Sequence, residues 1–263
     1  MNQDNYLPLL IHKPVGPTSF DIISSLRKIT GIKKIGHAGT LDPLAKGLLI
    51  VLLGKTCKKQ DEFMGLPKEY IVEATFGAET DTYDREGIIV HRCEHDKLRL
   101  LNKNKISEML VGFVGQQEQT VPPFSAIKVN GQRLYKKARK GNIDFKNLPK
   151  RKINIFEIEL LEFVETHLST DKAGCNASLQ IPTAKIRVFC SKGTYVRSLV
   201  HDLGQKLGCS AYVSALIRTK IGKYRLEEAI TVEEFKKRWN QNPSFRYQIN
   251  DKVTNMKSFK TLK

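Results

Sequence analysis

One aspartate stands in a stretch of sequence that otherwise carries almost no charge. The segment GHAGTLDPLAKGLL, residues 36–49, contains three glycines, a histidine and a single carboxylate, Asp42, just before an apolar run over residues 48–53. Two interpretations fit these residues. Asp42, followed by Pro43, could cap a helix that begins there. Alternatively, the carboxylate lies in a dry site, paired with an arginine that keeps it ionised, and acts as a nucleophile.

A candidate for that arginine occurs in CSKGTYVRSLVHDLG, residues 190–204. Gly193 and Thr194 are typical of a helix start, which places Arg197 in the first turn. The helix dipole disfavours a cation there by a few tenths of a kcal/mol up to about 1 kcal/mol. An arginine at this position is therefore expected to hold an anion, although a solvated arginine whose stem covers apolar surface also fits. Tyr70, at the start of a predicted strand, is either a core residue or a ring that stacks on a base.

The charge balance points to a polyanionic partner. The 263 residues include 44 Lys and Arg against 27 Asp and Glu, a net charge of +17. This excess favours nucleic acid first and an acidic membrane surface second, and a basic protein without such a partner is the third reading. Residues 128–152 carry ten of the cations and one acid. Within them, five cations can neutralise several phosphates, although a solvated charge run also fits: Arg133, Lys136, Lys137, Arg139 and Lys140.

Several other site types fit the sequence less well. LLGKT lacks the glycine that a P-loop requires at the position of Leu49. His91, Cys93 and His95 alternate in HRCEH and could bind zinc, but no fourth ligand is evident. The five cysteines are scattered without a CxxC pair, which indicates a reducing compartment. We also expect no signal peptide and no membrane-spanning segment, and therefore a cytoplasmic protein.

The hydrophobic periodicity predicts an α+β fold, because strands and helices interleave without regular βαβ alternation. Helices are expected at residues 18–31, 106–113 and 196–207 and from Thr231, and strands at residues 48–53, 70–76, 153–164 and 177–190. From Pro243 onward the sequence is polar and basic, with too few apolar residues to make a core.

Six segments, in order over residues 9–235, together resemble the TruB family of tRNA pseudouridine-55 synthases. They read HKPVGPTS, GHAGTLDPLAKGLL, EYIVEATFGAETDTYDREG, VPPFSAIKVNGQRLYKKARKG, CSKGTYVRSLVHDLG and LIRTKIGKYRLEEAI. The resemblance implies a pseudouridine synthase fold, with a mixed, mostly antiparallel central sheet flanked by helices. It implies a catalytic domain over residues 1–240, with a basic insertion at about 121–152 over the active-site cleft. Residues 241–263 would form a basic tail where many relatives have an RNA-binding PUA domain.

The resemblance also implies the reaction and its residues. A uridine in the T-loop of tRNA would be flipped out and isomerised to pseudouridine, without metal or cofactor. Asp42 matches the family's catalytic aspartate, which attacks either the base or the sugar. Arg197 matches the arginine that pairs with this aspartate, and Tyr70 matches the tyrosine that packs on the base. Lys13 and Pro14 match a lysine–proline motif that lines the same cleft.

The remaining matches concern RNA. His37 matches a histidine that enters the T-loop. Arg218 matches one of two adjacent arginines, and Ile217 replaces the other, so one RNA contact is in doubt. The implied partner is the T-arm stem-loop of tRNA, bound by a monomer. A non-catalytic tRNA-binding or folding protein on the same scaffold is the alternative, and the intact set of Asp42, Tyr70 and Arg197 argues against it.

Overall fold

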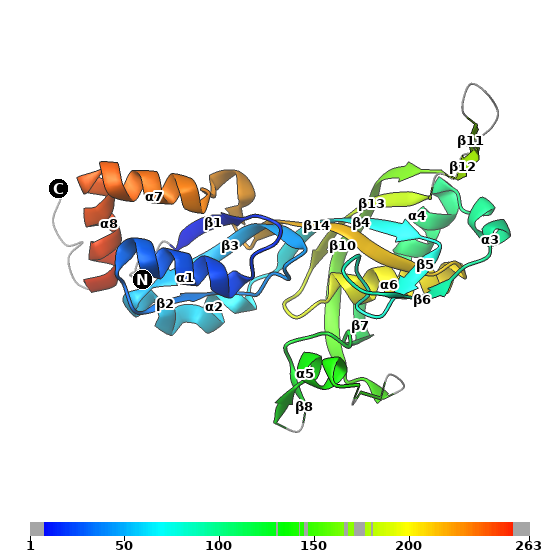
Figure 1. Ribbon diagram of the computed structural model, residues 1–263, viewed down its shortest axis with the longest axis horizontal. Helices are drawn as coiled ribbons and strands as arrows, with labels where there is room; N and C mark the ends of the chain where they lie inside the picture. Colours follow the sequence, from blue (N-terminus) through cyan, green and yellow to red (C-terminus); the bar gives the residue numbers. More distant parts are fainter. Residues whose placement is uncertain are drawn as a thin grey trace. The chain divides into compact units, whose positions relative to one another are not determined.

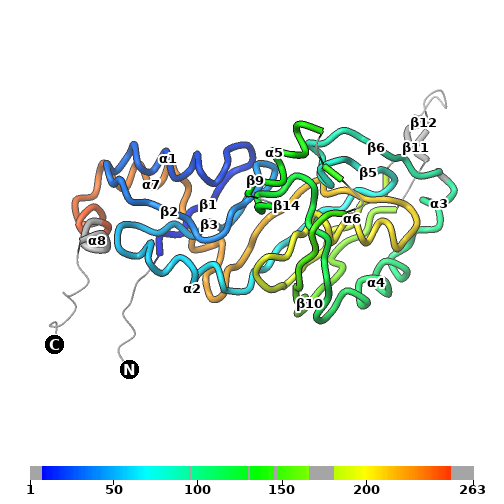
Figure 2. Tube along the Cα trace, turned by 90° about the horizontal axis from the view of Figure 1, so that it is seen from below, coloured from blue at the N-terminus to red at the C-terminus, as the bar shows by residue number. Residues whose placement is uncertain are grey.

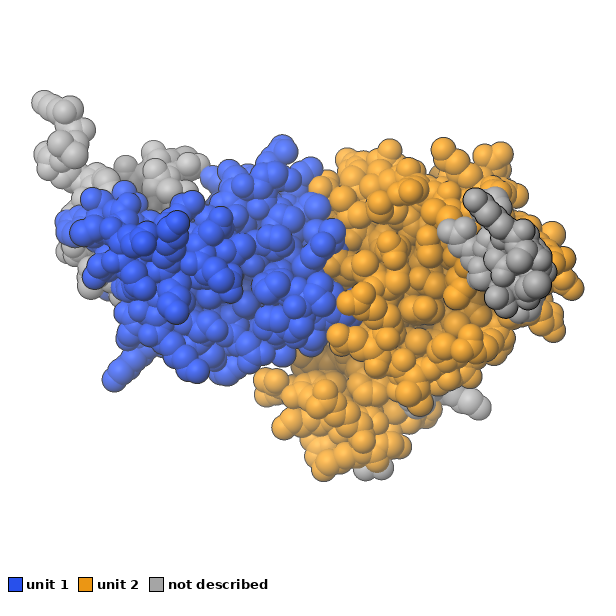
Figure 3. Space-filling model, turned by 45° about the horizontal axis from the view of Figure 1, so that its top comes forward, with its two compact units in different colours: residues 1–68, 217–263 blue, residues 69–216 orange. Residues whose placement is uncertain are grey.

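The structure is a computed structural model that describes residues 8–129, 131–141, 143–144, 147–165, 168–170, 177–179 and 181–254. The chain divides into two compact units, coloured separately in Figure 3. Unit 1 contains residues 1–68 and 217–263, and unit 2 contains residues 69–216. The chain passes from one unit to the other within two strands, β4 (Lys68–Phe76) and β14 (Ala211–Ile221).

The sheet of unit 1 is built around a strand that is buried on both faces. The strand order is β1 (Leu9–Lys13), β3 (Ala45–Leu53) and then β14, with β2 (Ile35–His37) also paired to β3 and β15 (Tyr224–Arg225) to β14. Successive side chains of a strand point to opposite faces. Leu49, Val51 and Leu53 accordingly enter one core cluster, and Leu48, Ile50 and Leu52 enter another.

Two helices of unit 1 begin at the predicted residues, and the first of them also ends at the predicted glycine. Helix α1 (Ser19–Thr30) has a capping box between Thr18 and Asp21 and ends at Gly31, whose φ is 72°. Helix α7 (Val232–Gln241) has a second capping box, between Thr231 and Glu234. The two helices lie side by side (Figures 1 and 2). Unit 1 also contains α2 (Gln60–Gly65) and two 3₁₀ helices, Gly54–Lys59 and Leu226–Glu228.

The segment after Pro243 differs from the prediction. Residues Pro243–Thr254 form a helix, α8. Ile249 on this helix is only 2% exposed, and Phe245 packs against the same core cluster as Phe235 and Trp239. Residues four apart share one face of a helix, so two apolar side chains are enough to anchor it. The segment has too few apolar residues to make a core, but this helix adds two side chains to the core of unit 1.

Unit 2 has a sheet with helices α4 (Lys103–Val111) and α6 (Val196–Leu207) packed against each other. Its strand order is β14, β4, β13 (Thr183–Cys190), β10 (Lys150–Val164) and β7 (Gly115–Thr120). Strand β10 is antiparallel to both of its neighbours. The predicted apolar face of α6 is buried throughout: Val196, Leu199, Val200, Leu203 and Leu207.

The smaller elements of unit 2 are hairpins and short helices. Strands β5 (Ala78–Thr80) and β6 (Ile89–Arg92) pair, as do β11 (Leu168–Thr170) and β12 (Ala177–Leu179), and α3 (His95–Arg99) follows β6. The basic insertion contains the hairpin β8 (Lys128–Val129) and β9 (Gln132–Arg133), then α5 (Leu134–Arg139). Val121, Leu134 and Leu148 give this insertion a small core of its own. The predicted α+β class is confirmed.

Candidate active site

Asp42 lies in the loop between β2 and β3, with a half-buried side chain. Its neighbours Leu41 and Leu44 are 3% and 1% exposed, so buried apolar side chains anchor the loop on both sides of Asp42. No helix begins at Pro43, since the chain turns there and enters β3 at Ala45. The helix-cap interpretation of Asp42 is therefore wrong. Its role as a nucleophile stays a prediction.

Contacts on both sides of Asp42 hold this loop in place. The hydroxyl of Ser19, at the start of α1, accepts from the backbone N–H of Leu41 at 2.9 Å and donates to its carbonyl at 3.2 Å. Lys13 is fully buried, and its ammonium donates to the carbonyls of Pro14 at 2.8 Å and Pro43 at 3.4 Å. A buried cation is tolerated only where such acceptors surround it. The lysine–proline motif thus anchors the aspartate loop.

Arg218 on β14 supports the same loop from within unit 1. Its side chain is 1% exposed, and the guanidinium donates to the carbonyls of Leu48 at 2.8 Å and Gly39 at 3.0 Å. Gly47 permits this arrangement, because a Cβ at that position would lie 2.4 Å from the Arg218 carbonyl oxygen and its φ is +113°. Arg218 was predicted to bind RNA, which stays untested. Its described hydrogen bonds go to the backbone of the Asp42 loop and of β3, which they stabilise.

His37 ends β2 and is half-buried. Its carbonyl accepts from the side-chain amide of Gln60 at 2.9 Å, which fixes the backbone. Burial lowers the pKa of the imidazole, and the nearby charge of Arg218 lowers it further. Since the pKa lies below its usual value, His37 presents a neutral ring at pH 7, suited to stacking or hydrogen bonding rather than to pairing with phosphate.

Arg197 in unit 2 occupies the first turn of α6, as predicted, although the helix begins at Val196 rather than at Thr194. The side chain is 4% exposed. Its guanidinium lies 3.3 Å from the carboxylate of Asp84 and donates to the carbonyls of Thr82 at 2.8 Å and Phe124 at 3.0 Å. Arg197 thus holds an anion within unit 2, but this anion is Asp84 and not the Asp42 that the sequence predicts.

Asp84 is the functional candidate that the sequence analysis missed. TDTYDREG, residues 80–87, has the composition of an exposed turn, yet Asp84 is 4% exposed. One carboxylate oxygen faces Arg197, and the other accepts from the hydroxyl of Thr82 at 2.7 Å and the N–H of Glu86 at 3.0 Å. The predicted pair of Asp42 and Arg197 would join residues of the two units and stays a prediction.

The other predicted residues of unit 2 lie on β4 and in the insertion. Tyr70 is half-buried on β4, on the strand face that Val72 and Phe76 share. Of the insertion's five cations, Lys137 is half-buried and four are exposed: Arg133, Lys136, Arg139 and Lys140. The Arg139 guanidinium lies 5.5 Å from the ring of Tyr135, within cation–π range. These cations are accessible to a polyanion, as RNA binding requires.

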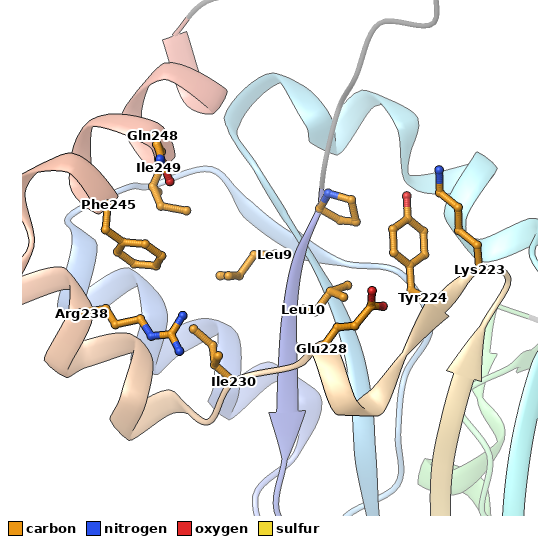
Figure 4. Close-up of a pocket in the computed structure, with 11 residues that line it drawn as sticks. Leu9, Leu10, Lys223, Tyr224, Glu228, Ile230, Arg238, Phe245, Gln248 and Ile249 are labelled. Atoms are coloured by element: carbon orange, nitrogen blue, oxygen red, sulfur yellow. The ribbon is translucent and has the colours of Figure 1, made fainter.

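Other regions of the described structure offer no alternative centre of chemistry. Among the described side chains, no group of three or more His, Cys, Asp or Glu residues could hold a metal. In the possible zinc motif, His91 Nδ1 lies 3.1 Å from the hydroxyl of Ser210. A surface pocket of about 410 Å³ in unit 1 is lined mainly by apolar side chains such as Leu9 and Phe245, with Arg238 beside them (Figure 4). It contains none of the predicted site residues. No helix in the described part of the chain has the length and apolar character needed to cross a bilayer.

Known protein families match nearly the whole chain. The family model of the TruB family pseudouridylate synthase N-terminal domain matches residues 27–196, and that of the tRNA pseudouridylate synthase B C-terminal domain matches residues 197–253. The chain is 41% identical over 228 residues to tRNA pseudouridine synthase B of Aquifex aeolicus (strain VF5), covering 86% of this chain and 72% of that protein. It is 40% identical over 251 residues to tRNA pseudouridine synthase B of Phocaeicola vulgatus, covering 92% and 97%.

Solved structures agree at the level of the fold. A chain in the crystal structure of a Cbf5-Nop10-Gar1 complex superposes with a TM-score of 0.64 at 24% identity, covering 95% of this chain and 60% of that one. A chain in a structure of an H/ACA RNP bound to a substrate RNA containing 2'-deoxyuridine gives a TM-score of 0.61, also at 24% identity, covering 90% and 56%. At this level of identity, the similarity concerns the architecture of the chain.

Proposed function

The chain belongs to the TruB family of pseudouridylate synthases, which are isomerases, and from this premise we propose that it converts uridine 55 in the T-loop of tRNA to pseudouridine. Relatives named tRNA pseudouridine synthase B, at about 40% identity over most of the chain, support tRNA as the substrate. They do not favour a non-catalytic tRNA-binding protein. We further propose that a monomer acts and that the T-arm stem-loop is sufficient for recognition.

The reaction exchanges one bond to the ribose for another. Asp42 attacks either the sugar at C1′ or the uracil ring, and the bond between N1 and C1′ breaks. The uracil turns within the closed site, a bond forms between C5 and C1′, and the covalent bond to Asp42 breaks. C5 loses its proton and N1 gains one. No electrons are gained or lost overall. Water must stay out while the uracil is detached, because it would otherwise capture the sugar.

The observation that carries this proposal is the fixed position of the Asp42 loop. Ser19 and Lys13 hold the backbone on either side of Asp42, and Arg218 holds it at Gly39. A nucleophile held in place before the substrate arrives avoids an entropic cost during the reaction. The target base must leave its stack, at a cost of a few kcal/mol. Phosphate contacts from the insertion can offset that cost.

A T-arm stem-loop is expected to be modified at a single uridine without any added cofactor. The purified chain is incubated with the synthetic stem-loop in buffer containing EDTA, and pseudouridine is located by chemical mapping. A stem-loop with cytidine at the target position serves as the control and should remain unmodified. Absence of pseudouridine from the uridine-containing stem-loop, when full-length tRNA is modified, would contradict T-arm sufficiency. Absence from both RNAs would contradict the proposed function.

Charge reversal in the insertion is expected to weaken RNA binding and flatten its salt dependence. Replacing Lys136, Lys137 and Lys140 by glutamate removes three cations, so the slope of log K against log[salt] should decrease by about 2–3. Filter binding of the stem-loop across a salt series measures this slope. A matched variant reverses three lysines outside the insertion, Lys103, Lys236 and Lys237, with the same change in net charge. An equal loss of slope in both variants would contradict a specific role for the insertion.

A further inference from the structure

Tyr83 has a backbone conformation that residues with side chains rarely adopt. Its φ is +62°, in the left-handed region, at a position occupied by neither glycine nor asparagine. The peptide groups around it are fixed, since its N–H donates to the carbonyl of Thr80 at 3.1 Å and its carbonyl accepts from the N–H of Val213 at 3.1 Å. Such a conformation persists only where the surroundings impose it, often at a functional site.

The Tyr83 side chain packs face to face on the imidazole of His201. The ring centroids are 3.9 Å apart and the planes differ by 6°. Burial lowers the pKa of His201 to about 4, so the imidazole is neutral at pH 7. Its Nδ1 lies 3.8 Å from a carboxylate oxygen of Glu79, too far for a hydrogen bond. Among the described contacts, the stack on Tyr83 is therefore the main interaction of the His201 ring.

The stack lies beside the buried ion pair of the candidate site. His201 follows Arg197 by four residues on α6, so both side chains project from the same face of the helix. Arg197 contacts Asp84 and the carbonyl of Thr82, the two neighbours of Tyr83 in the chain. Thr82, Tyr83 and Asp84, which are consecutive in the chain, thus contact Arg197 and His201, which lie one turn apart on α6.

From this arrangement we propose that His201 and Tyr83 are positioning residues for the reaction. The stack keeps Tyr83 in its left-handed conformation, and this conformation sets the direction of the chain at Asp84. Loss of the stack lets φ of Tyr83 relax, which moves the Asp84 carboxylate and the Thr82 carbonyl away from the Arg197 guanidinium. The inference rests on the proposed function, in which Arg197 belongs to the active site.

Removing one ring tests the proposal, and a replacement ring provides the control. His201→Ala is expected to lower the single-turnover rate of pseudouridine formation by about tenfold to 100-fold, while the Kd for tRNA changes little. His201→Phe retains a flat ring and should restore most of the rate. Tyr83→Ala lacks the ring and disfavours the left-handed backbone, so it should behave like His201→Ala. Tyr83→Phe keeps the stack, so its rate should equal that of the chain without substitutions.

A second readout is independent of activity. The amide of Glu86 donates to the Asp84 carboxylate, so its hydrogen exchange reports the position of Asp84. We expect faster exchange at this amide in His201→Ala and Tyr83→Ala, and unchanged exchange in His201→Phe. Full activity of Tyr83→Ala, or equal loss in His201→Ala and His201→Phe, would overturn the proposal. If the unmodified chain forms no pseudouridine, the proposed function fails, whereas the exchange pattern still decides whether the stack positions Asp84.

Discussion

Asp42→Asn is expected to abolish pseudouridine formation, with a fall in the single-turnover rate of about 10⁴-fold or more. Asparagine has the shape of aspartate but lacks its negative charge and is a poor nucleophile. The contacts that hold the loop come from Ser19, Lys13 and Arg218 and go to backbone atoms, which this substitution leaves in place. We therefore expect tRNA binding to be largely retained. Rapid quench with chemical mapping of the product measures the rate, and filter binding measures the Kd.

Asp61→Asn is the matched control for this substitution. Asp61 is an exposed aspartate on α2 of unit 1, so its replacement by asparagine causes the same change in charge away from the Asp42 loop. We expect its rate to equal that of the unmodified chain. Continued modification by Asp42→Asn would mean that another group is the nucleophile. Loss of tRNA binding together with activity would instead mean that Asp42 acts in binding.

Local signals account for the part of the fold that could be predicted. The capping boxes at Thr18 and Thr231 each depend on residues three apart, and the left-handed Gly31 ends α1 where predicted. The strand over residues 48–53 was also predicted, but the structure begins it at Ala45. The start of β3 depends on pairing with β1, where Lys13 lies opposite Gly47. This partner is distant in sequence, so no local pattern reveals it.

In the candidate site, too, the residues in distinctive segments could be predicted, whereas contacts between distant parts of the chain could not. Asp42, Tyr70 and Arg197 could be named because their sequence segments are distinctive. The burial of Asp84 and Arg218 could not be predicted, since their partners lie far along the chain: Arg197 for Asp84, and the carbonyls of Gly39 and Leu48 for Arg218. A turn sequence rich in Thr and Asp usually indicates exposure. Only the packing of this turn against α6 makes its aspartate a buried partner.

Asp84→Ala is expected to reduce the free energy of unfolding by about 3–5 kcal/mol and to remove most of the activity. The Arg197 side chain is 4% exposed, so loss of Asp84 removes the carboxylate that lies 3.3 Å from this buried guanidinium. Thr82 and Glu86 lose their acceptor as well. Urea unfolding followed by circular dichroism measures the stability, and the single-turnover assay measures the rate.

A double variant separates the structural role of this pair from its role in the reaction. Asp84→Leu combined with Arg197→Met removes both charges and fills the space with apolar atoms, so most of the lost stability should return. Activity should not return, because the guanidinium is then absent. The exposed pair of Lys185 and Glu162, 2.8 Å apart, provides the contrast, since Glu162→Gln should leave the urea midpoint almost unchanged. Recovery of activity together with stability in the double variant would show that Arg197 serves the fold alone, and the guanidinium would then have no part in isomerisation.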